Sequence, residues 1–270
     1  MNTFLRLTFM STWRRLKEIT RYKVNFGLDT AMSFVWALGA LILAAVVDPL
    51  KLQSTVGSPN YPVFLLIGVA FQAYTGASTY GGYEIHDELT KGQIEYTFAS
   101  PVSRYYYMLS YSLSQAIIGT IFSLLPMFAI AALLSGGGLP SPSAMAMACL
   151  SVILAFLALC QIGVIISSAL LILKNVSAIM NFFNFLQQFA TGMLVPVQFL
   201  PEPMQALAFV IPFTHGIDLA RHFILGTSTI WPVEVELGAL VALLVVLSIL
   251  AKFSTSYLER KAKREGLSLA

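Results

Sequence analysis

The chain has 270 residues, of which 57% are hydrophobic and 11% are charged, and its mean hydropathy is +0.77. An ordinary soluble domain carries about 25% charged residues, so this composition excludes a water-soluble globular domain. The net charge is +3, and the basic residues gather at both ends of the chain. Basic tails can bind nucleic acid, but basic flanks beside apolar spans are the ordinary mark of a cytoplasmic membrane edge, and we expect no nucleic-acid partner.

Residues 5–23 are expected to form an amphipathic helix. At about 100° per residue, one face collects Leu5, Phe9 and Trp13, and Arg14 and Lys17 lie on the opposite face. Such a helix is expected to lie flat on the cytoplasmic leaflet in contact with membrane lipid. This helix could have a mechanical role in the protein, or it could serve only as an anchor to the membrane.

Six stretches are apolar and long enough to cross a bilayer, whose hydrocarbon core of about 30 Å needs about 20 helical residues. They are approximately 28–47, 61–80, 106–134, 144–173, 176–195 and 236–252. The sequence therefore predicts an all-α polytopic membrane protein with six transmembrane helices, forming a single domain over residues 1–270.

The distribution of Lys and Arg predicts the orientation of these spans. Six precede the first span, two lie in the 81–105 loop, one is Lys174 and five follow the last span, whereas only Lys51 and Arg221 fall on the other side. One predicted side of the membrane thus carries fourteen Lys and Arg residues and the other carries two. Because cytoplasmic loops carry the excess of Lys and Arg, both termini are predicted to lie in the cytoplasm. We expect a multi-pass protein of the cell's inner (plasma) membrane.

The stretch between the last two predicted spans is apolar but interrupted by five prolines. Prolines remove helix hydrogen bonds. Irregular backbone is not tolerated in contact with lipid. We therefore expect two short helices on the outer side, roughly 202–211 and 214–225, that dip partly into the membrane and pack on the protein.

The sequence contains no GxxxxGK[ST] phosphate-binding loop, because the glycine-rich stretch GGGLPSPS at 136–143 lacks the lysine. If transport is driven by ATP, the ATPase is therefore expected on another chain.

The predicted cytoplasmic loop between the second and third spans reads YEIHDELTKGQIEYTFASPVSRYYY over residues 83–107. A short charged helix capped by Gly92, a second helical piece and a break at Ser100 and Pro101 predict a rigid polar projection. Its carboxylates make it acidic, unlike the other predicted cytoplasmic regions: Glu84, Asp87, Glu88 and Glu95.

Two patterns resemble ABC-2 type transporter permeases, the membrane subunits of bacterial and archaeal ABC exporters. The loop pattern carries Glu88, Gly92, Glu95, Ser100, Pro101, Ser103 and Arg104. The second, at 194–226, carries Pro196, Leu200, Pro201, Pro212, Thr214, Arg221 and Gly226. The resemblance covers essentially the whole chain and is closest to drug and lipid export permeases of the daunorubicin-resistance type.

The resemblance implies a homodimer or heterodimer of six-helix permeases seated on two ABC ATPase subunits, which would bind ATP and Mg²⁺ in place of this chain. It makes 83–105 the coupling loop and 195–228 the outer re-entrant helices. The residues expected to couple to the ATPase are Glu84, Asp87, Glu88, Gly92, Glu95, Ser100, Pro101 and Arg104. The chain itself is then not an enzyme.

The predicted cargo is an amphipathic drug or a lipid-like molecule, because the spans are apolar with only scattered amides. Export of a polysaccharide or glycoconjugate, or of sodium, by the same architecture is the alternative. A membrane scaffold that tethers an ATPase without transport is a further one. An integral membrane enzyme is disfavoured, because no acid, base, nucleophile or metal set is clustered at membrane depth.

Polar side chains within the spans outline a candidate substrate path. Asn181, Asn184 and Gln188 follow one stripe of the fifth predicted span, and Gln72 lies in the second. Contact with cargo is one interpretation. Hydrogen bonding between helices is the other, since amides commonly join helices in membranes.

His215, Asp218 and His222 share one face of a predicted outer helix and are conceivable metal ligands. A polar network that includes Arg221 is the preferred interpretation, so we predict no metal. Few charges lie inside the spans, which disfavours an ion-coupled secondary transporter.

Overall fold

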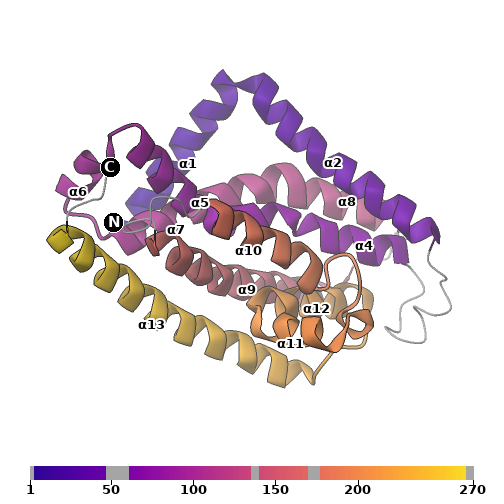
Figure 1. Cartoon of the computed structure of the whole chain (residues 1–270). Helices are drawn as coiled ribbons and strands as arrows, with labels where there is room; N and C mark the ends of the chain where they lie inside the picture. Colours follow the sequence, from indigo (N-terminus) through magenta and orange to yellow (C-terminus); the bar gives the residue numbers. More distant parts are fainter. Residues whose placement is uncertain (1–2, 47–60, 135–139, 170–176, 266–270) are drawn as a thin grey trace.

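The computed structural model describes residues 3–46, 61–134, 140–169 and 177–265. Over these ranges the chain is helical and contains no strand, which confirms the predicted all-α class. Figure 1 shows long helices running side by side, with the short helices α11 and α12 at one end of the bundle and α6 at the other.

The first two helices form an inverted V at the top of Figure 1. Helix α1 (Thr3–Arg21) packs on α7, and α2 (Lys23–Val46) packs mainly on α4. The predicted amphipathic helix is therefore present, and its apolar side chains Leu5, Phe9 and Trp13 are exposed. An exposed apolar face on a polar helix is typical of a helix that lies in a membrane interface.

The second predicted span is longer than expected. It consists of α4 (Tyr61–Ala70) and α5 (Gln72–Thr90), which are separated by a turn at Phe71. The predicted end at Tyr80 is wrong, since α5 continues for ten more residues into the charged stretch. Apolar composition marked only the first part of this stretch, whereas the helix continues through polar and charged residues.

The third span begins near its predicted start. Helix α6 (Ile94–Ala99) precedes α7 (Arg104–Gly119), which continues through the π-helix η1 (Thr120–Leu124) into α8 (Leu125–Leu134). Short π-helical turns inside α-helices are rare and frequently mark functional positions.

The fourth span, α9 (Pro142–Ser168), has a local reason for its start. The Ser141 hydroxyl accepts a hydrogen bond from the Ala144 amide at 3.2 Å, and Pro142 occupies the first helical position, where a missing N–H costs nothing. Part of its predicted C-terminal region, 170–173, lies outside the described residues.

The fifth predicted span, 176–195, is wrong at its end. Helix α10 (Ser177–Ala190) stops well before Val195, and Gly192 then adopts a φ of +78°. The fourteen residues of α10 that the structure describes extend about 21 Å at about 1.5 Å per residue, less than a hydrocarbon core of about 30 Å. Apolar composition continued to Val195, but the helix did not.

The two short outer helices are confirmed as helices. After the 3-10 turn η3 (Val197–Phe199) come α11 (Glu202–Val210) and α12 (Pro212–Leu225), and α12 packs on α9, α13 and α4. The last helix, α13 (Val233–Glu265), is longer than the predicted 236–252.

By length and composition, five helical stretches among the described residues can cross a membrane, so the predicted count of six is not confirmed. They are Lys23–Ile42, Tyr61–Thr90, Arg104–Ala131, Pro142–Ser168 and Val233–Ala262. The outer surfaces of α2 and α13 are apolar, as a lipid-facing surface requires: Leu28, Met32, Leu38, Val245, Ile249 and Phe253 are exposed.

Helix α5 lies at the centre of the packing, against α7, α9 and α10. Small residues permit this approach. A Cβ on Gly81 would lie 2.2 Å from the carbonyl oxygen of Met108 in α7, and a Cβ on Gly163 of α9 would lie 2.1 Å from that of Ser78. Helices in lipid associate through such close backbone contacts and hydrogen bonds, because apolar burial gives little driving force there.

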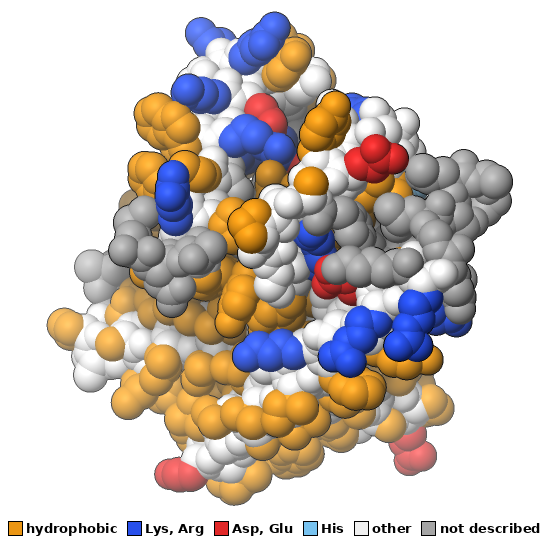
Figure 2. All heavy atoms as spheres, turned by 90° about the vertical axis from the view of Figure 1, so that its left-hand side faces the viewer, with side chains coloured by type: hydrophobic (Ala, Val, Ile, Leu, Met, Phe, Trp, Pro, Cys, Tyr) orange, Lys and Arg blue, Asp and Glu red, His pale blue; other side chains and the backbone are white. Residues whose placement is uncertain are grey.

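The first turns of α1, the last turns of α13 and helix α6 lie at the same end of the molecule (Figure 1). Figure 2 views this end directly, and Lys and Arg side chains are prominent on it. This arrangement agrees with the prediction that both terminal helices and the 83–105 loop share one side of the membrane.

Candidate functional site

The 83–105 loop is a compact turn of helix. Helix α5 ends at Thr90, Gly92 follows with a φ of +68°, and the Gln93 amide donates to the Glu88 carbonyl oxygen at 2.8 Å. A left-handed residue after a helix is most often glycine, because it has no Cβ to clash. The expected charged helix is therefore the end of α5 rather than a separate element, and α6 is the expected second piece.

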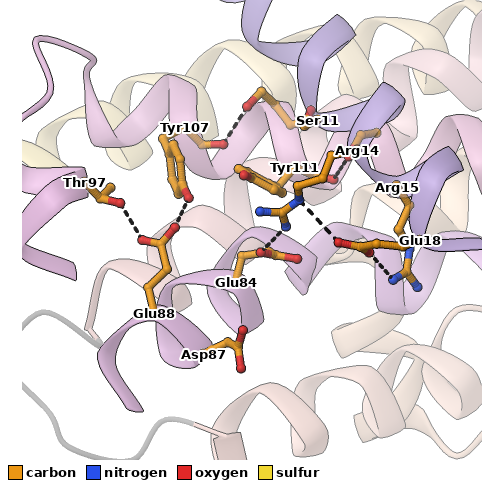
Figure 3. Close-up of polar contacts among 12 residues, drawn as sticks. Ser11, Arg14, Arg15, Glu18, Glu84, Asp87, Glu88, Thr97, Tyr107 and Tyr111 are labelled. Atoms are coloured by element: carbon orange, nitrogen blue, oxygen red, sulfur yellow. Dashed lines mark hydrogen bonds and ion pairs between the residues drawn. The ribbon is translucent and has the colours of Figure 1, made fainter. Parts of the chain in front are cut away.

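Glu88 joins three helices. Its carboxylate accepts hydrogen bonds from the Thr97 hydroxyl of α6, at 2.7 Å, and from the Tyr107 hydroxyl of α7 (Figure 3). Hydrogen bonds to a charged group are about twice as strong as neutral ones. Glu88 therefore holds α6 against the ends of α5 and α7, and its carboxylate is engaged within the loop.

Arg104 and Ser100 also act inside the loop. Arg104 is 3% exposed, and its guanidinium donates to the carbonyl oxygens of Val102, at 3.0 Å, and of Ser100, at 3.5 Å. The side chain thus closes the extended segment that connects α6 to α7. Pro101 lies on the outside of this segment and is exposed.

The outward face of α6 carries different residues. Ile94 is buried at 1% exposure, whereas Glu95 is exposed and Tyr96 is 80% exposed. An aromatic ring with that exposure at the tip of a rigid loop is typical of an anchor for a protein partner. Nothing in the loop pattern singled out Tyr96, which becomes apparent only once Ile94 and Thr97 are seen to face inward.

Two acidic residues of α5 lie beside the loop. Asp87 pairs with Lys91 at 2.5 Å on the exposed surface, and this hydrogen bond raises the pKa of Lys91. Glu84 is turned the other way, toward α1, and its side chain is only 12% exposed. Exposed pairs such as the first contribute little to stability, because solvent screens the two charges.

Helix α1 is attached to this site by Arg14. Its guanidinium donates to Glu84 at 2.5 Å and lies 4.8 Å from the centre of the Tyr111 ring (Figure 3). Burial lowers the pKa of Arg14, but the hydrogen bond to Glu84 and the nearby charges of Tyr111, Glu84 and Glu18 together raise it above its ordinary value. The Ser11 hydroxyl also donates to the Ser110 carbonyl oxygen at 3.2 Å. Polar contacts therefore join α1 to the ends of α5 and α7 beside the loop.

The second sequence pattern, at the opposite end of the molecule, centres on Arg221. This side chain is 3% exposed, and it donates to the carbonyl oxygens of Phe64 at 3.2 Å, Gly192 at 2.7 Å and Met193 at 2.8 Å. Its guanidinium also lies 3.6 Å from the centre of the Phe64 ring. Arg221 thus satisfies the backbone that α10 leaves unpaired where it ends.

Gly68 makes this contact possible. A Cβ there would lie 2.0 Å from the Met193 carbonyl oxygen and 2.3 Å from Arg221 Nη2.

Most of the remaining members of the second pattern lie at helix ends. Pro196 precedes η3, Pro201 precedes α11, and Pro212 begins α12. Gly226 ends α12 with a φ of +68°, and Thr214 is buried in its first turn. The second pattern is therefore a folding motif for the outer helices.

A family model described as ABC-2 family transporter protein matches residues 47–253, more than three quarters of the chain. The chain belongs to this family. No curated protein matches it. The ABC-2 match includes the whole 83–105 loop and the Arg221 pattern, and it leaves out all of α1 and α2 and the last turns of α13.

Membership in the ABC-2 family identifies the chain as a multi-pass membrane component of a transporter. The loop joining α5 to α7 and the short helices α11 and α12 lie at opposite ends of this ABC-2 subunit (Figure 1).

The amides of α10 face α5. Asn181 Oδ1 accepts from the Tyr83 hydroxyl at 2.7 Å, and Asn184 exchanges hydrogen bonds with the Thr79 hydroxyl at 3.2 to 3.3 Å. Hydrogen bonding between helices, one of the two interpretations of this stripe, therefore holds for both residues. The exposed face of α10 is instead aromatic: Phe182, Phe185 and Phe189.

The structure separates the conceivable metal ligands of α12. His215 Nδ1 lies 3.6 Å from Glu236 of α13, Asp218 accepts from the Ile230 amide at 2.8 Å, and His222 contacts the Thr227 carbonyl oxygen at 2.7 Å. Among the described residues, no group of three or more His, Cys, Asp or Glu side chains is placed to hold a metal ion.

Proposed function

We propose that the chain is the permease subunit of an ATP-driven ABC exporter and that separate ATPase subunits dock on the outward face of α6. The observation that carries this proposal is the exposed Glu95 and Tyr96 face of a short helix that Glu88 fixes to α5 and α7. Family membership supports the pairing of such a membrane subunit with ATPases.

The contacts of α6 suggest how force reaches the membrane. In this proposal, a force applied by the ATPase at Tyr96 displaces α6. Because Ile94 is buried and Thr97 is bonded to Glu88, which also bonds Tyr107, this displacement acts on α5 and α7 together. Since α5 packs against α7, α9 and α10, its displacement moves the helices that surround it. Closely packed interiors transmit displacement because they have little free volume.

In this proposal ATP and Mg²⁺ are bound by the partner ATPases, and two permease subunits, identical or different, form the transport unit. Both termini and α6 lie on the cytoplasmic side of the inner membrane. Helices α11 and α12 lie on the outer side and dip into the bilayer, where packing of α12 on α9 and α13, and of α11 on α10 and α12, covers the backbone.

The proposed cargo is an amphipathic drug or a lipid-like molecule, because the spans are largely apolar. Gln72 and Gln188 are the better candidates for contact with cargo, since both are partly buried and neither side chain has a hydrogen-bond partner among the described residues. Asn181 and Asn184 are engaged with α5, so they border the proposed path and shape it.

The test is ATP-driven transport in liposomes that contain the full chain and its ATPase. Daunorubicin, which is fluorescent and amphipathic, serves as the probe. The proposal predicts transport that needs both proteins and ATP, and that is lost when Tyr96 is replaced by Ala. ATP hydrolysis without movement of any amphipathic probe would favour an ATPase-tethering scaffold instead.

A further inference from the structure

Two adjoining hollows lie in the angle between α1 and α2. The first has a volume of about 280 Å³ and is lined where α1 bends into α2, by Arg15, Glu18, Tyr22, Asn25 and Phe26 among others. The second, of about 130 Å³, lies between α2 and the helices α5, α7 and η1, and it shares Arg15 and Phe26 with the first. Their joint volume falls within the range of small-molecule sites, about 300 to 1,000 Å³.

The linings combine polar and apolar side chains. Arg15, Glu18 and Asn25 line the first hollow together with Phe26, and the second is lined by Ile118 and Phe122 as well as by polar residues: Thr30, Ser33, Gln115 and Ser123. Phe26 and Phe122 meet edge to face, with ring centres 4.8 Å apart, and so join α2 to η1. A lining that offers both charged groups and aromatic rings matches an amphiphile.

Two residues that line the second hollow each carry a buried side-chain atom without a partner. Among the described residues, Arg15 Nε and Gln115 Oε1 have no hydrogen-bond partner, although both atoms are buried. A buried polar atom without a partner destabilises the fold, so such atoms are rare and call for an explanation. Arg15 Nε is a donor and requires an acceptor, and Gln115 Oε1 is an acceptor and requires a donor.

The charge around the first hollow favours an anion. Glu18 is shared by Arg14, at 3.4 Å, and Arg15, at 3.0 Å, and Arg14 also pairs with Glu84. The two arginines and the two glutamates of this group therefore carry no net charge together. Three further cations of this region are exposed and have no ion pair among the described residues: Lys17, Arg21 and Lys23. In Figure 2, Lys and Arg side chains gather at the top of the view, over the bend between α1 and α2.

We propose that the two hollows bind one anionic phospholipid of the surrounding bilayer. Its phosphate accepts from Arg15 Nε, a hydroxyl of its headgroup donates to Gln115 Oε1, and an acyl chain lies along Phe26, Ile118 and Phe122. The site rests on the proposed placement of α1 at the cytoplasmic leaflet but not on ATP-driven transport. Most of the first hollow belongs to α1 and α2, outside the residues that the family model matches.

Phosphatidylglycerol fulfils all three requirements, because it carries a phosphate and a headgroup with free hydroxyls. Phosphatidylmethanol has the same charge without a hydroxyl, and phosphatidylcholine is neutral overall. The experiment is native mass spectrometry of the full chain, purified in detergent and mixed with each of these lipids. The expected order of retention is phosphatidylglycerol, then phosphatidylmethanol, then phosphatidylcholine, with one phosphatidylglycerol per chain.

Two substitutions separate the contacts. Arg15→Gln should weaken retention of both anionic lipids about tenfold, as loss of a hydrogen bond to a charged group does. Gln115→Leu should lower phosphatidylglycerol to the level of phosphatidylmethanol and leave phosphatidylmethanol unchanged. Arg6→Gln is the matched control, because Arg6 is an exposed cation of α1 that lines neither hollow.

Circular dichroism checks that each variant keeps its helical content, and Arg15→Lys, which keeps the charge, should retain part of the binding if Arg15→Gln fails to fold. Equal retention of the three lipids by the unchanged chain would overturn the proposal. So would an equal loss in Arg15→Gln and Arg6→Gln, which would show only attraction to a basic surface. None of these readouts involves the ATPase, so failure of this site and failure of the proposed export function are distinguishable.

Discussion

Glu88 of α5 and Tyr107 of α7 meet in a hydrogen bond where the two helices leave the bundle. The same carboxylate accepts from Thr97 of α6, so a single side chain determines how the exposed tip of the loop is oriented. Glu88 and Glu95, which the sequence pattern groups together, thus have different surroundings: the first is internal to the loop and the second is exposed.

Replacing Glu88 by Ala should loosen α6 without removing its outward face. Each lost hydrogen bond to the carboxylate contributes about 1.5 to 3 kcal/mol, so α6 is expected to lose its fixed position. ATPase binding should fall modestly, whereas ATP-driven transport should fall strongly, measured by copurification and by dye transport in liposomes. Asp87→Ala, which removes an exposed neighbouring carboxylate, is the control and should leave both readouts nearly unchanged.

Tyr96→Ala should reduce binding of the ATPase directly. Exposed aromatic anchors of protein interfaces contribute about 2 kcal/mol or more when buried by a partner, which corresponds to a Kd raised at least tenfold. The Kd is measured with purified full chain and ATPase. Tyr257→Ala on α13 removes another exposed ring, which stacks on Phe253, and it should have no such effect. An equal loss in both variants would contradict a docking role for Tyr96.

Gly68→Ala should destabilise the outer helices. Its Cβ would collide with the Met193 carbonyl oxygen and with Arg221, so the buried guanidinium must give up contacts to backbone oxygens. Overpacking typically costs about 1 to 3 kcal/mol, and a lowered midpoint of thermal unfolding in detergent is expected. Gly76→Ala is the matched control, since no atom lies within 4 Å of a Cβ there and helical alanine is favoured by about 0.5 to 1 kcal/mol.

Asn184→Leu should weaken the contact between α10 and α5 rather than change cargo preference alone. In a double-mutant cycle with Thr79→Val, the coupling energy should be near 0.6 kcal/mol, about the average for hydrogen bonds between membrane helices. Gln188→Leu, at a side chain without such a bond, should instead alter the preference among several amphipathic dyes and leave stability unchanged. Zero coupling between Asn184 and Thr79 would refute the first expectation.

Much of the helical architecture was predictable from hydropathy and from the positions of Pro and Gly. Pro212 and Gly226 mark the two ends of α12, and α1 has the alternation of apolar and charged residues that its interfacial position requires. The predicted end of the fifth span was wrong because an apolar segment need not be helical. Residues 191–195 are apolar enough to extend α10, but their carbonyl oxygens bind Arg221 in an irregular segment.

The candidate site was predictable as a segment but not as a surface. The sequence located the 83–105 loop, yet Glu88 and Arg104 looked like docking residues because charge suggests exposure, and both are engaged within the loop. Arg14 and Glu84 are 70 positions apart, so no local pattern relates them. Tyr96 has no distinguishing feature in sequence, since its exposure follows from which neighbouring residues face inward.

The most direct test of the account places a photo-crosslinking amino acid at Tyr96 and, as a control, at Tyr257 in the full chain coexpressed with its ATPase. The account predicts an adduct between the two proteins from position 96 and none from position 257. No adduct from position 96, or adducts of equal yield from both positions, would contradict docking of the ATPase on α6.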